Sequence, residues 1–430
     1  MKQKPLAVAA LSTCVGTHQK STFAFNALLC VAAAVVIAVR DPSFLIQPRF
    51  WAEEGAVYFQ SALDRPPLEA LFAPHQGYFS LIANVGGILA TLPSLEYAPL
   101  VTTMIAFIIQ LSLVIAIALS NAPFLKSALS KTLASAALIL VGARGDLWFT
   151  TISSQQFFPV LVFLILCHDK YGGRGLWLRT VVISLSGLAS VTACFLLPLF
   201  LIRYIQRRQT EDRLLFSVLA ASTAIQLAVI AYSYLVLGQT TYYDPSSQVR
   251  FASPVPLSYL PVRIAYYAIQ YPVLGRYQGL VASFGINVAA VLLMIYAVTR
   301  RCADYWYFLG AIWVLTVFSV LGSIQMNGGP RYAYAPSCIF ALFLLAIAFD
   351  EAVAPLFRRL SVVLFAIAMV VWVPYYRSGL DGFRNPAWPS WAEEVRAWRS
   401  DPSHSALYIH PDWPSQRKQG LAWVVRIKRP

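Results

Sequence analysis

Long apolar stretches recur along almost the whole of this 430-residue chain, and they constrain its fold more than any other feature. A helix needs about 20 mostly apolar residues to cross the hydrocarbon core of a membrane. Hydrophobic residues make up 58% of the chain and charged residues only 12%, about half the share of charge in an average globular domain. A soluble fold could not bury so much apolar surface, because its exterior needs polar cover. The composition therefore excludes a soluble enzyme and a disordered chain.

The sequence predicts an all-α polytopic membrane protein with about eleven transmembrane helices. Thr180–Tyr204 is interrupted around Ser190–Thr192 and has basic residues at both ends, so we expect two short helices that form a hairpin. Phe23–Val39 lies too far from the N-terminus for a signal peptide and lacks a cleavage site of small residues, so we expect a retained first span. The single spans are expected near Phe23–Val39, Ala98–Leu119, Thr132–Phe149, Phe157–Cys167, Leu214–Leu237, Leu280–Thr299, Tyr305–Gln325, Tyr334–Phe349 and Val362–Pro374.

The stretch Tyr78–Pro93 decides the predicted orientation. Counted as a span, it inverts every later loop and places Lys126 and Lys131 outside. Counted as an interfacial helix, it gives the cytoplasmic loops sixteen basic and six acidic residues, in agreement with the positive-inside rule. We therefore predict a multi-pass membrane protein with a cytoplasmic N-terminus.

Residues 1–374 are predicted to form the membrane domain, and residues 375–430 a small extracytoplasmic tail of mixed structure. The tail is helix-like at Trp391–Arg399 and strand-like at Ala406–Ile409 and Ala422–Ile427. The formal charge of +14 is shared between the cytoplasmic loops and this tail, so it indicates topology rather than a nucleic-acid partner. The six scattered cysteines form no CxxC pair and indicate neither a disulfide framework nor a zinc site.

The first outer loop, residues 40–96, carries the adjacent acids Glu53 and Glu54. Apolar residues around them fall at helical spacing, which predicts a helix on the membrane surface with both carboxylates in its first turn. Acids in that position also favour the helix dipole without any catalytic role. The apolar stripe consists of Ala52, Ala56, Phe59 and Leu63, with Trp51 and Tyr58 expected at the headgroup level.

This loop resembles the first outer loop of the GT-C superfamily of membrane glycosyltransferases, the superfamily of the protein mannosyltransferases and aminoarabinose transferases. The family pattern is an acidic pair followed by a tyrosine soon after the first span, then an H-P-P-L-like stretch before another juxtamembrane helix. The matching segments here are Glu53-Glu54-Gly55-Ala56-Val57-Tyr58 and Pro74-His75-Gln76-Gly77-Tyr78. Glu53 stands where Asp is commoner in the family, and Gln76-Gly77 replace the two prolines.

The resemblance implies transfer of a sugar from a polyprenyl-phosphate donor to a glycan, lipid or protein acceptor on the outer face, with inversion. Such a transfer needs a carboxylate that takes the proton of the acceptor hydroxyl. We hypothesise that Glu53 is this base and that Glu54 orients it or binds sugar or acceptor. The resemblance also favours Arg331 and Tyr332 as contacts of the lipid phosphate, since a guanidinium group suits phosphate. An interfacial arginine beside anionic headgroups stays an alternative.

The other outer loops hold further candidates for substrate binding. Arg144 and Asp146 either bind ligand or pair with each other, and Gln155 follows them in the same loop. In the third loop Tyr243 suits stacking on a sugar, although an interfacial aromatic belt explains it equally well. His75 is expected to position its neighbours rather than bind a metal. A divalent cation between Asp146 and Glu54 is a further option, but no cluster of residues has metal-ligand spacing, so no metal site is predicted.

Two other function classes compete with a glycosyltransferase. A transporter or flippase of lipid-linked saccharides would place ionisable residues within its spans, whereas here the spans are almost free of charge. A polysaccharide polymerase or ligase would also use arginines of outer loops. The acidic pair so soon after the first span favours the transferase over both, and a structural membrane scaffold would need no acids and arginines gathered on one face.

Overall fold

The computed structural model describes residues 6–75, 77–142, 147–168, 173–236, 257–276, 279–299, 303–323, 329, 331–377, 388–410 and 423–427. Within these residues, Gly175–Ala189 and Val191–Arg207 together are apolar enough to span a membrane, as a pair bent by 120°. Single helices long and apolar enough to do so are Thr22–Arg40, Leu95–Ala118, Thr210–Leu235, Asp304–Leu321 and Pro355–Tyr376. The prediction of a helical protein of membrane type is confirmed at this level, and the count of eleven spans stays a prediction.

Every predicted span coincides with at least one helix in the part of the chain described. The longer helices are α1 (Leu6–Arg40), α6 (Ala98–Ala118), α7 (Ala128–Leu140), α8 (Phe158–Leu166), α9 (Gly173–Ala189), α11 (Leu197–Arg207), α12 (Thr210–Leu235), α15 (Leu280–Thr299), α16 (Ala303–Leu321), α17 (Tyr334–Phe349) and α18 (Pro355–Trp372).

The remaining elements are short connecting ones, the ten-residue α5 and the elements of the C-terminal tail. They are α2 (Ser43–Ile46), η1 (Glu54–Phe59), α3 (Gln60–Asp64), α4 (Pro67–Phe72), α5 (Leu81–Ala90), η2 (Leu95–Tyr97), η3 (Pro123–Leu125), η5 (Ile152–Gln156), α10 (Val191–Cys194), η7 (Leu257–Tyr259), α13 (Leu260–Ala265), η8 (Tyr266–Gln270), α14 (Tyr271–Leu274), η10 (Val373–Tyr376), α19 (Trp391–Ser400), β1 (Leu407–Tyr408) and β2 (Val424–Val425).

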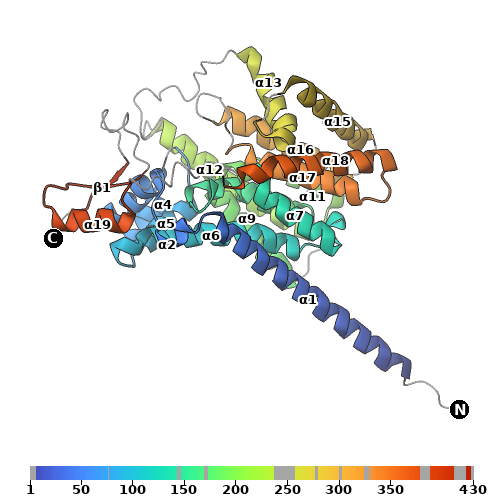
Figure 1. Ribbon diagram of the computed structural model, residues 1–430, viewed down its shortest axis with the longest axis horizontal. Coiled ribbons are helices and arrows are strands. Elements are labelled where there is room, and N and C mark those ends of the chain that lie inside the picture. The colour runs from blue at the N-terminus through green and yellow to red at the C-terminus, as the bar shows by residue number, and fades with distance from the viewer. Residues whose placement is uncertain are drawn as a thin grey trace.

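The core of the bundle is built around α8 and α17. All nine residues of α8 and the run from Tyr334 to Ile347 in α17 are buried. A helix that is apolar on every side is expected to be enclosed by other helices, and α17 contacts α7, α8, α16 and α18. Figure 1 shows α1 extending away from this bundle, while α19 and β1 lie on the side of α2, α4 and α5.

Helix α7 ends earlier than the sequence predicts. The expected helix Thr132–Phe149 stops at Leu140, and Gly142 follows with a φ of 67°. A residue in this left-handed region breaks a helix, and a Cβ there would lie 3.0 Å from the Cβ of Ser337. Trp148 and Phe149 therefore belong to the loop before η5 and not to the helix.

Two other predictions for residues 1–374 can be compared with the structure, namely a break between two helices and a helix that does not span. The break expected around Ser190–Thr192 is confirmed, because α9 ends at Ala189 and the Ser190 side chain caps α10. The stretch Tyr78–Pro93 forms only α5, whose ten residues extend about 15 Å and are too short to cross a membrane of about 30 Å. This length supports its interpretation as a helix that does not span.

The C-terminal tail folds back onto the first outer loop. Its predicted helix and strands are confirmed as α19 and the antiparallel pair β1–β2, with Leu407 opposite Val425. A second apolar cluster joins tail and loop, and it contains Phe50, Ala56, Phe59, Ala90, Ala98, Trp391, Val395, Trp398, Leu407, Ile409 and Val425. The tail and the acidic pair are thus parts of one packed region.

Candidate active site

Glu53 and Glu54 stand at the start of a π-helix. η1 begins at Glu54, has Glu53 as its N-terminal flanking residue and continues directly into α3. Ala52, just before them, has a φ of 40°, which non-glycine residues seldom adopt. π-helical turns are rare and occur frequently at functional sites. The backbone therefore departs from a regular helix at the two acids that the sequence singles out.

Glu54 is buried, and neutral donors hold its carboxylate. It is 1% exposed. Its Oε1 accepts hydrogen bonds from the backbone N–H and the hydroxyl of Thr151, both at 2.6 Å, and its Oε2 accepts one from the N–H of Trp51 at 3.4 Å. Burial raises the pKa of Glu54 to about 7, and these hydrogen bonds oppose the rise. Glu54 therefore ties the first outer loop to the second and exchanges its proton near neutral pH.

Glu53 differs from its neighbour because it is only partly buried. It lies one π-helical turn before Tyr58, at the i and i+5 positions that such a helix brings together. Burial raises the pKa of Tyr58 well above its usual value, and Tyr78 and the charge of Glu53 add to the rise. The Glu53 carboxylate is therefore within electrostatic reach of the Tyr58 phenol and is partly exposed.

Protein covers the helix that the sequence predicts at the membrane surface, and its position relative to a membrane stays a prediction. Every residue of η1 is buried, and Tyr58, which was expected at the headgroup level, is only 3% exposed. The reason is tertiary packing, because α5 covers one side of η1 and β2 contacts it as well. Ala56 and Phe59 of the predicted apolar stripe therefore pack against protein, whereas Leu63 is 39% exposed.

His75 lies against Tyr58, in the segment that carries the second part of the family resemblance. Its ring meets the Tyr58 ring edge to face, with centroids 4.9 Å apart, and its backbone pairs with Tyr78. Burial and the positive charge of Arg65 lower the pKa of His75 to about 4, so its imidazole is neutral at pH 7. Its Nε2 is buried and finds no hydrogen-bond partner among the described residues.

Three glycines allow the close packing around Glu54. A Cβ on Gly87 of α5 would lie 2.6 Å from the carbonyl oxygen of Tyr58, and a Cβ on Gly86 would lie 3.1 Å from Cγ2 of Thr151. A Cβ on Gly55 would lie 2.5 Å from Cδ1 of Ile409 in the tail. The site thus depends on close contacts that larger residues would prevent, with backbone at Gly87 and with side chains at Gly86 and Gly55.

The tail fixes the far side of η1 and α3. Trp391 packs edge to face on Phe50 at 5.1 Å and donates its indole N–H to the carbonyl of Leu95 at 2.7 Å. The Gln60 side chain accepts a hydrogen bond from the Arg426 N–H at 2.6 Å and donates one to the Arg426 carbonyl at 3.0 Å. These contacts give the tail a role in holding the helix that bears the acidic pair.

In the second outer loop, the predicted binding residue Gln155 forms hydrogen bonds through its backbone carbonyl. The carbonyl oxygen of Gln155 accepts hydrogen bonds from the hydroxyls of Ser190 and Thr192, at 2.7 and 2.8 Å. The break in the bent helix pair therefore holds η5, which follows Thr151. Three other predicted binding residues, Arg144, Asp146 and Tyr243, lie outside the described residues.

Arg331 and Tyr332 lie just before α17. The guanidinium of Arg331 donates from Nη2 to the Tyr332 hydroxyl at 3.2 Å, and its carbon lies 5.1 Å from the centre of the Tyr332 ring. An aromatic chain leads from here to the second loop, with Tyr334 against Phe157 at 4.9 Å and Phe157 against Trp148 at 5.5 Å. Arg331 and Tyr332 thus lie at the start of the helix whose Tyr334 contacts the second loop.

Two residues that sequence reasoning missed hold the site together. Thr151 is the main partner of Glu54, from 97 positions further along the chain, and no local pattern marks it. Arg40 is fully buried at the end of α1, where its guanidinium lies 4.2 Å from the Trp148 ring and donates to the carbonyl of Ile139 at 2.9 Å. A charged residue that ends an apolar span is a signal that could have identified Arg40.

Within the described residues no group of three or more His, Cys, Asp and Glu side chains could hold a metal ion. Asp146, considered above as a partner of Glu54 for a divalent cation, lies outside them. A scan against protein-family models gave no match, and searches of curated proteins and of solved structures gave none either.

Proposed function

We propose that this chain is a GT-C-like membrane glycosyltransferase that uses a polyprenyl-phosphate sugar as donor. The acceptor is a glycan, lipid or protein of the cell envelope, on the outer face of a bacterial-type inner membrane. The observation that carries the proposal is the arrangement of the acidic pair on a π-helix. Glu54 is buried and anchored by Thr151, whereas the adjacent Glu53 is accessible.

In this proposal the two carboxylates have different roles. Glu53 takes the proton of the acceptor hydroxyl while the acceptor oxygen attacks the anomeric carbon and the bond to the lipid phosphate breaks, which inverts the configuration. Arg331 and Tyr332 stabilise the departing phosphate through hydrogen bonds and charge. Glu54 is a positioning residue, because its oxygens accept hydrogen bonds from Thr151 and Trp51.

The decisive experiment incubates purified protein with a panel of polyprenyl-phosphate sugars and measures transfer or hydrolysis. The Glu53→Gln variant should be slower by about 100-fold or more, the range expected for loss of a general base. Glu69→Gln, which changes an exposed acid of the same loop in α4, should leave the rate within about twofold of the unaltered protein. A Glu53→Gln variant that retains the rate of the control would contradict the assignment of the base.

The proposed orientation has its own test in a cysteine-free version of the protein. Glu69→Cys in the first loop should react with an impermeant maleimide only from the outer face, and Arg359→Cys near the start of α18 only from the cytoplasmic face. Both side chains are exposed, so access to reagent does not depend on local unfolding. Labelling of Glu69→Cys from the cytoplasmic face would overturn the topology and the site on the outer face together.

A further inference from the structure

Residues 70–95 have a composition suited to the interior of a membrane. They include no Asp, Glu, Lys or Arg, and Glu69 and Glu96 flank them. They contain the end of α4, a turn and α5, which is too short to cross a membrane. Such a segment either lies above the membrane or enters one leaflet and returns, and its level along the spanning helices distinguishes the two arrangements.

The turn before α5 lies deep along α12, a helix long and apolar enough to span a membrane. The N–H of Phe79 donates to Oε1 of Gln226 at 3.2 Å, and its carbonyl accepts from Nε2 of Gln226 at 2.9 Å. Helix α12 is uncharged from residue 214 to residue 235, about 32 Å, which matches a hydrocarbon core of about 30 Å. Gln226 lies nine residues before Leu235, so Phe79 is about 13 Å from the nearer end of this uncharged part.

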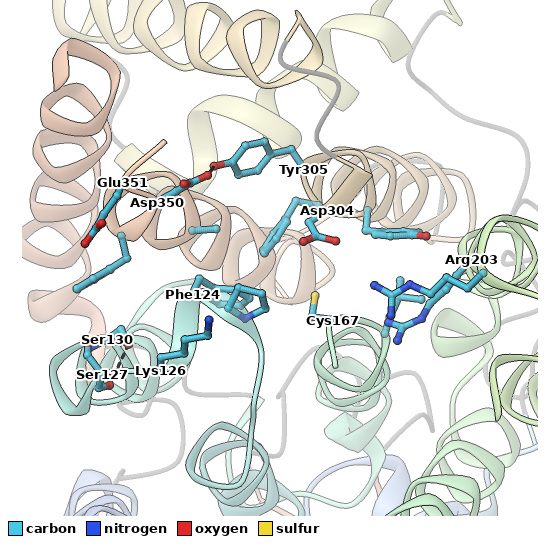
Figure 2. A pocket seen from close by; sticks show the side chains of 17 residues that line it. Phe124, Lys126, Ser127, Ser130, Cys167, Arg203, Asp304, Tyr305, Asp350 and Glu351 are labelled. Atoms are coloured by element: carbon cyan, nitrogen blue, oxygen red, sulfur yellow. Dashed lines mark hydrogen bonds between the residues drawn. The ribbon is translucent and has the colours of Figure 1, made fainter. Parts of the chain in front are cut away.

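Charged residues at the start of α12 mark the other end of its uncharged part. Asp212 pairs with the buried Arg203 at 2.9 Å. Arg203 also lines a cavity of about 490 Å³ where charged residues from several helix ends gather, as Figure 2 shows for Lys126, Asp304 and Asp350. These charges place one boundary of the hydrocarbon core just after the first turn of α12, and Phe79 is therefore close to the opposite boundary but inside it.

Helix α6 gives the same level independently. A Cβ on Gly86 of α5 would lie 3.6 Å from Cγ2 of Thr102 in α6 and 3.1 Å from Cγ2 of Thr151, the partner of Glu54. Thr102 comes six residues after Glu96, the last charged residue before this span, or about 9 Å along the helix. Helix α5 therefore lies beside the first turns of the span rather than above its end.

The turn between α4 and α5 also meets the condition for non-helical backbone at membrane depth, because protein groups pair with its polar atoms. His75 and Tyr78 exchange N–H to carbonyl hydrogen bonds at 3.1 and 3.2 Å. The Asn84 side chain donates to the carbonyls of Leu71 and Ala73, both at 2.9 Å. Together with the two hydrogen bonds to Gln226 described above, these contacts replace partners that hydrocarbon does not offer.

Apolar side chains of α4 nevertheless face outward at this depth. Phe72 is 62% exposed, and its ring stacks on that of the buried Phe79 with the centroids 6.3 Å apart. Leu68, one turn earlier on the same face, is exposed as well. On α12, Leu227 is next to Gln226 and is 61% exposed. A span that faces lipid exposes apolar side chains in this way, so Phe72 borders the same surroundings as Leu227.

We propose that the segment formed by residues 70–75 and 77–95 is re-entrant and that the exposed face of α4 contacts the acyl chains of a membrane leaflet. Helix α4 leads into the leaflet on the side of Glu54, the turn reaches about 13 Å below the edge of the hydrocarbon, and α5 leads out again. Contact with acyl chains removes Phe72 and Leu68 from water. The inference rests on α6 and α12 crossing the membrane and not on the proposed transferase activity.

The test places a nitroxide spin label on single cysteines of a cysteine-free protein in phosphatidylcholine vesicles. It compares collisions of the label with oxygen, which concentrates in hydrocarbon, and with a neutral nickel chelate, which stays in water. Leu227→Cys is the reference for lipid, and Arg396→Cys, at an exposed position of α19, is the reference for water. We expect the ratio of oxygen to nickel collisions at Phe72→Cys to lie within about twofold of the lipid reference and at least about tenfold above the water reference.

The other outcomes count against the proposal. A label at Phe72→Cys that is as accessible to nickel as the one at Arg396→Cys would overturn it, because the face of α4 would then border water. Few collisions with either reagent would overturn it too, since protein would then cover this face. A nickel-accessible label at Leu227→Cys would show that α12 does not lie in lipid and would remove the basis of the proposal. If Phe72→Cys does not fold, Leu68→Cys on the same face carries the same expectation.

Discussion

At one end of the helix bundle Glu54 is buried among neutral hydrogen-bond donors, whereas at the other end Arg203 and Asp212 are buried as a pair of opposite charges. Glu54 receives its hydrogen bonds from Thr151 and Trp51. Arg203 and Asp212 join α11 to α12 across a short turn, and their side chains are 3% and 2% exposed. Both ends therefore bury charged groups, but they compensate the burial differently.

Because of this difference, Glu54 can change its protonation state, whereas the Arg203–Asp212 pair holds two helices in place. Dipoles compensate a buried carboxylate less completely than a neighbouring cation does, so the pKa of Glu54 rises to about 7. An ion pair keeps both partners charged and depends on both being present. The end that holds Glu54 is thus suited to proton exchange, and the other end to fixing α11 against α12.

The largest stability effect is expected when one partner of the ion pair is removed. Asp212→Ala removes the carboxylate that accepts from the buried Arg203 guanidinium and should destabilise the fold by about 3–5 kcal/mol. Thermal unfolding in detergent, followed by tryptophan fluorescence, measures the change.

The matched control removes both partners. Arg203→Met together with Asp212→Leu replaces the pair by apolar groups of similar size, so it should cost much less than Asp212→Ala alone. A double variant as unstable as the single one would show that the contact with His168 or the local packing matters more than the charge pair, and the contrast with Glu54 would fail.

The next effect concerns the pH dependence of stability at Glu54. The pKa of Glu54 in the folded state, about 7, lies above its ordinary value of 4.5, so the folded state binds the proton more tightly than the unfolded state does. Stability from this group is fully present below pH 4.5 and is lost as the pH rises through 7. The shift corresponds to about 3 kcal/mol over that window. The unfolding temperature of the unaltered protein should therefore fall from pH 5 to pH 8 relative to that of Glu54→Gln.

His75 makes the comparison with Glu54→Gln necessary. The pKa of His75 is lowered to about 4, so its contribution to stability increases as the pH rises from about 4 to 6.5, opposite to that of Glu54. The glutamine variant retains His75, and subtracting its profile leaves the contribution of Glu54. Parallel profiles for the two proteins would show that Glu54 does not titrate in this range.

Local patterns in the sequence predict local structure well in this chain. The helix and strands of the tail were predicted within a few residues of α19, β1 and β2, because their boundaries depend on neighbouring residues. The break at Ser190 was predicted for the same reason, since polar residues interrupt an apolar run there.

Contacts between distant segments could not be predicted in the same way. Thr151 reaches Glu54 across 97 positions, and nothing in its neighbourhood distinguishes it from other threonines. The burial of Tyr58 depends on α5, and that of Ala56 and Phe59 on the tail, so the amphipathic stripe alone could not show that these side chains pack against protein. The acidic pair itself was visible in the sequence, whereas the different roles of Glu53 and Glu54 became visible only from their different burial.

The smallest expected effect tests how tightly the outer end is packed. Gly87→Ala places a Cβ 2.6 Å from the oxygen and 2.8 Å from the carbon of the Tyr58 carbonyl, and a backbone group cannot move aside as a flexible side chain can. We expect a loss of about 1–3 kcal/mol, typical of overpacking, in the same unfolding assay. The control is Gly285→Ala in α15, where nothing lies within 4 Å of the added Cβ, and it should be neutral or stabilising by up to about 1 kcal/mol. If Gly87→Ala is as stable as this control, α5 and η1 do not meet backbone to backbone. The burial that sets the pKa of Glu54 would then need another explanation.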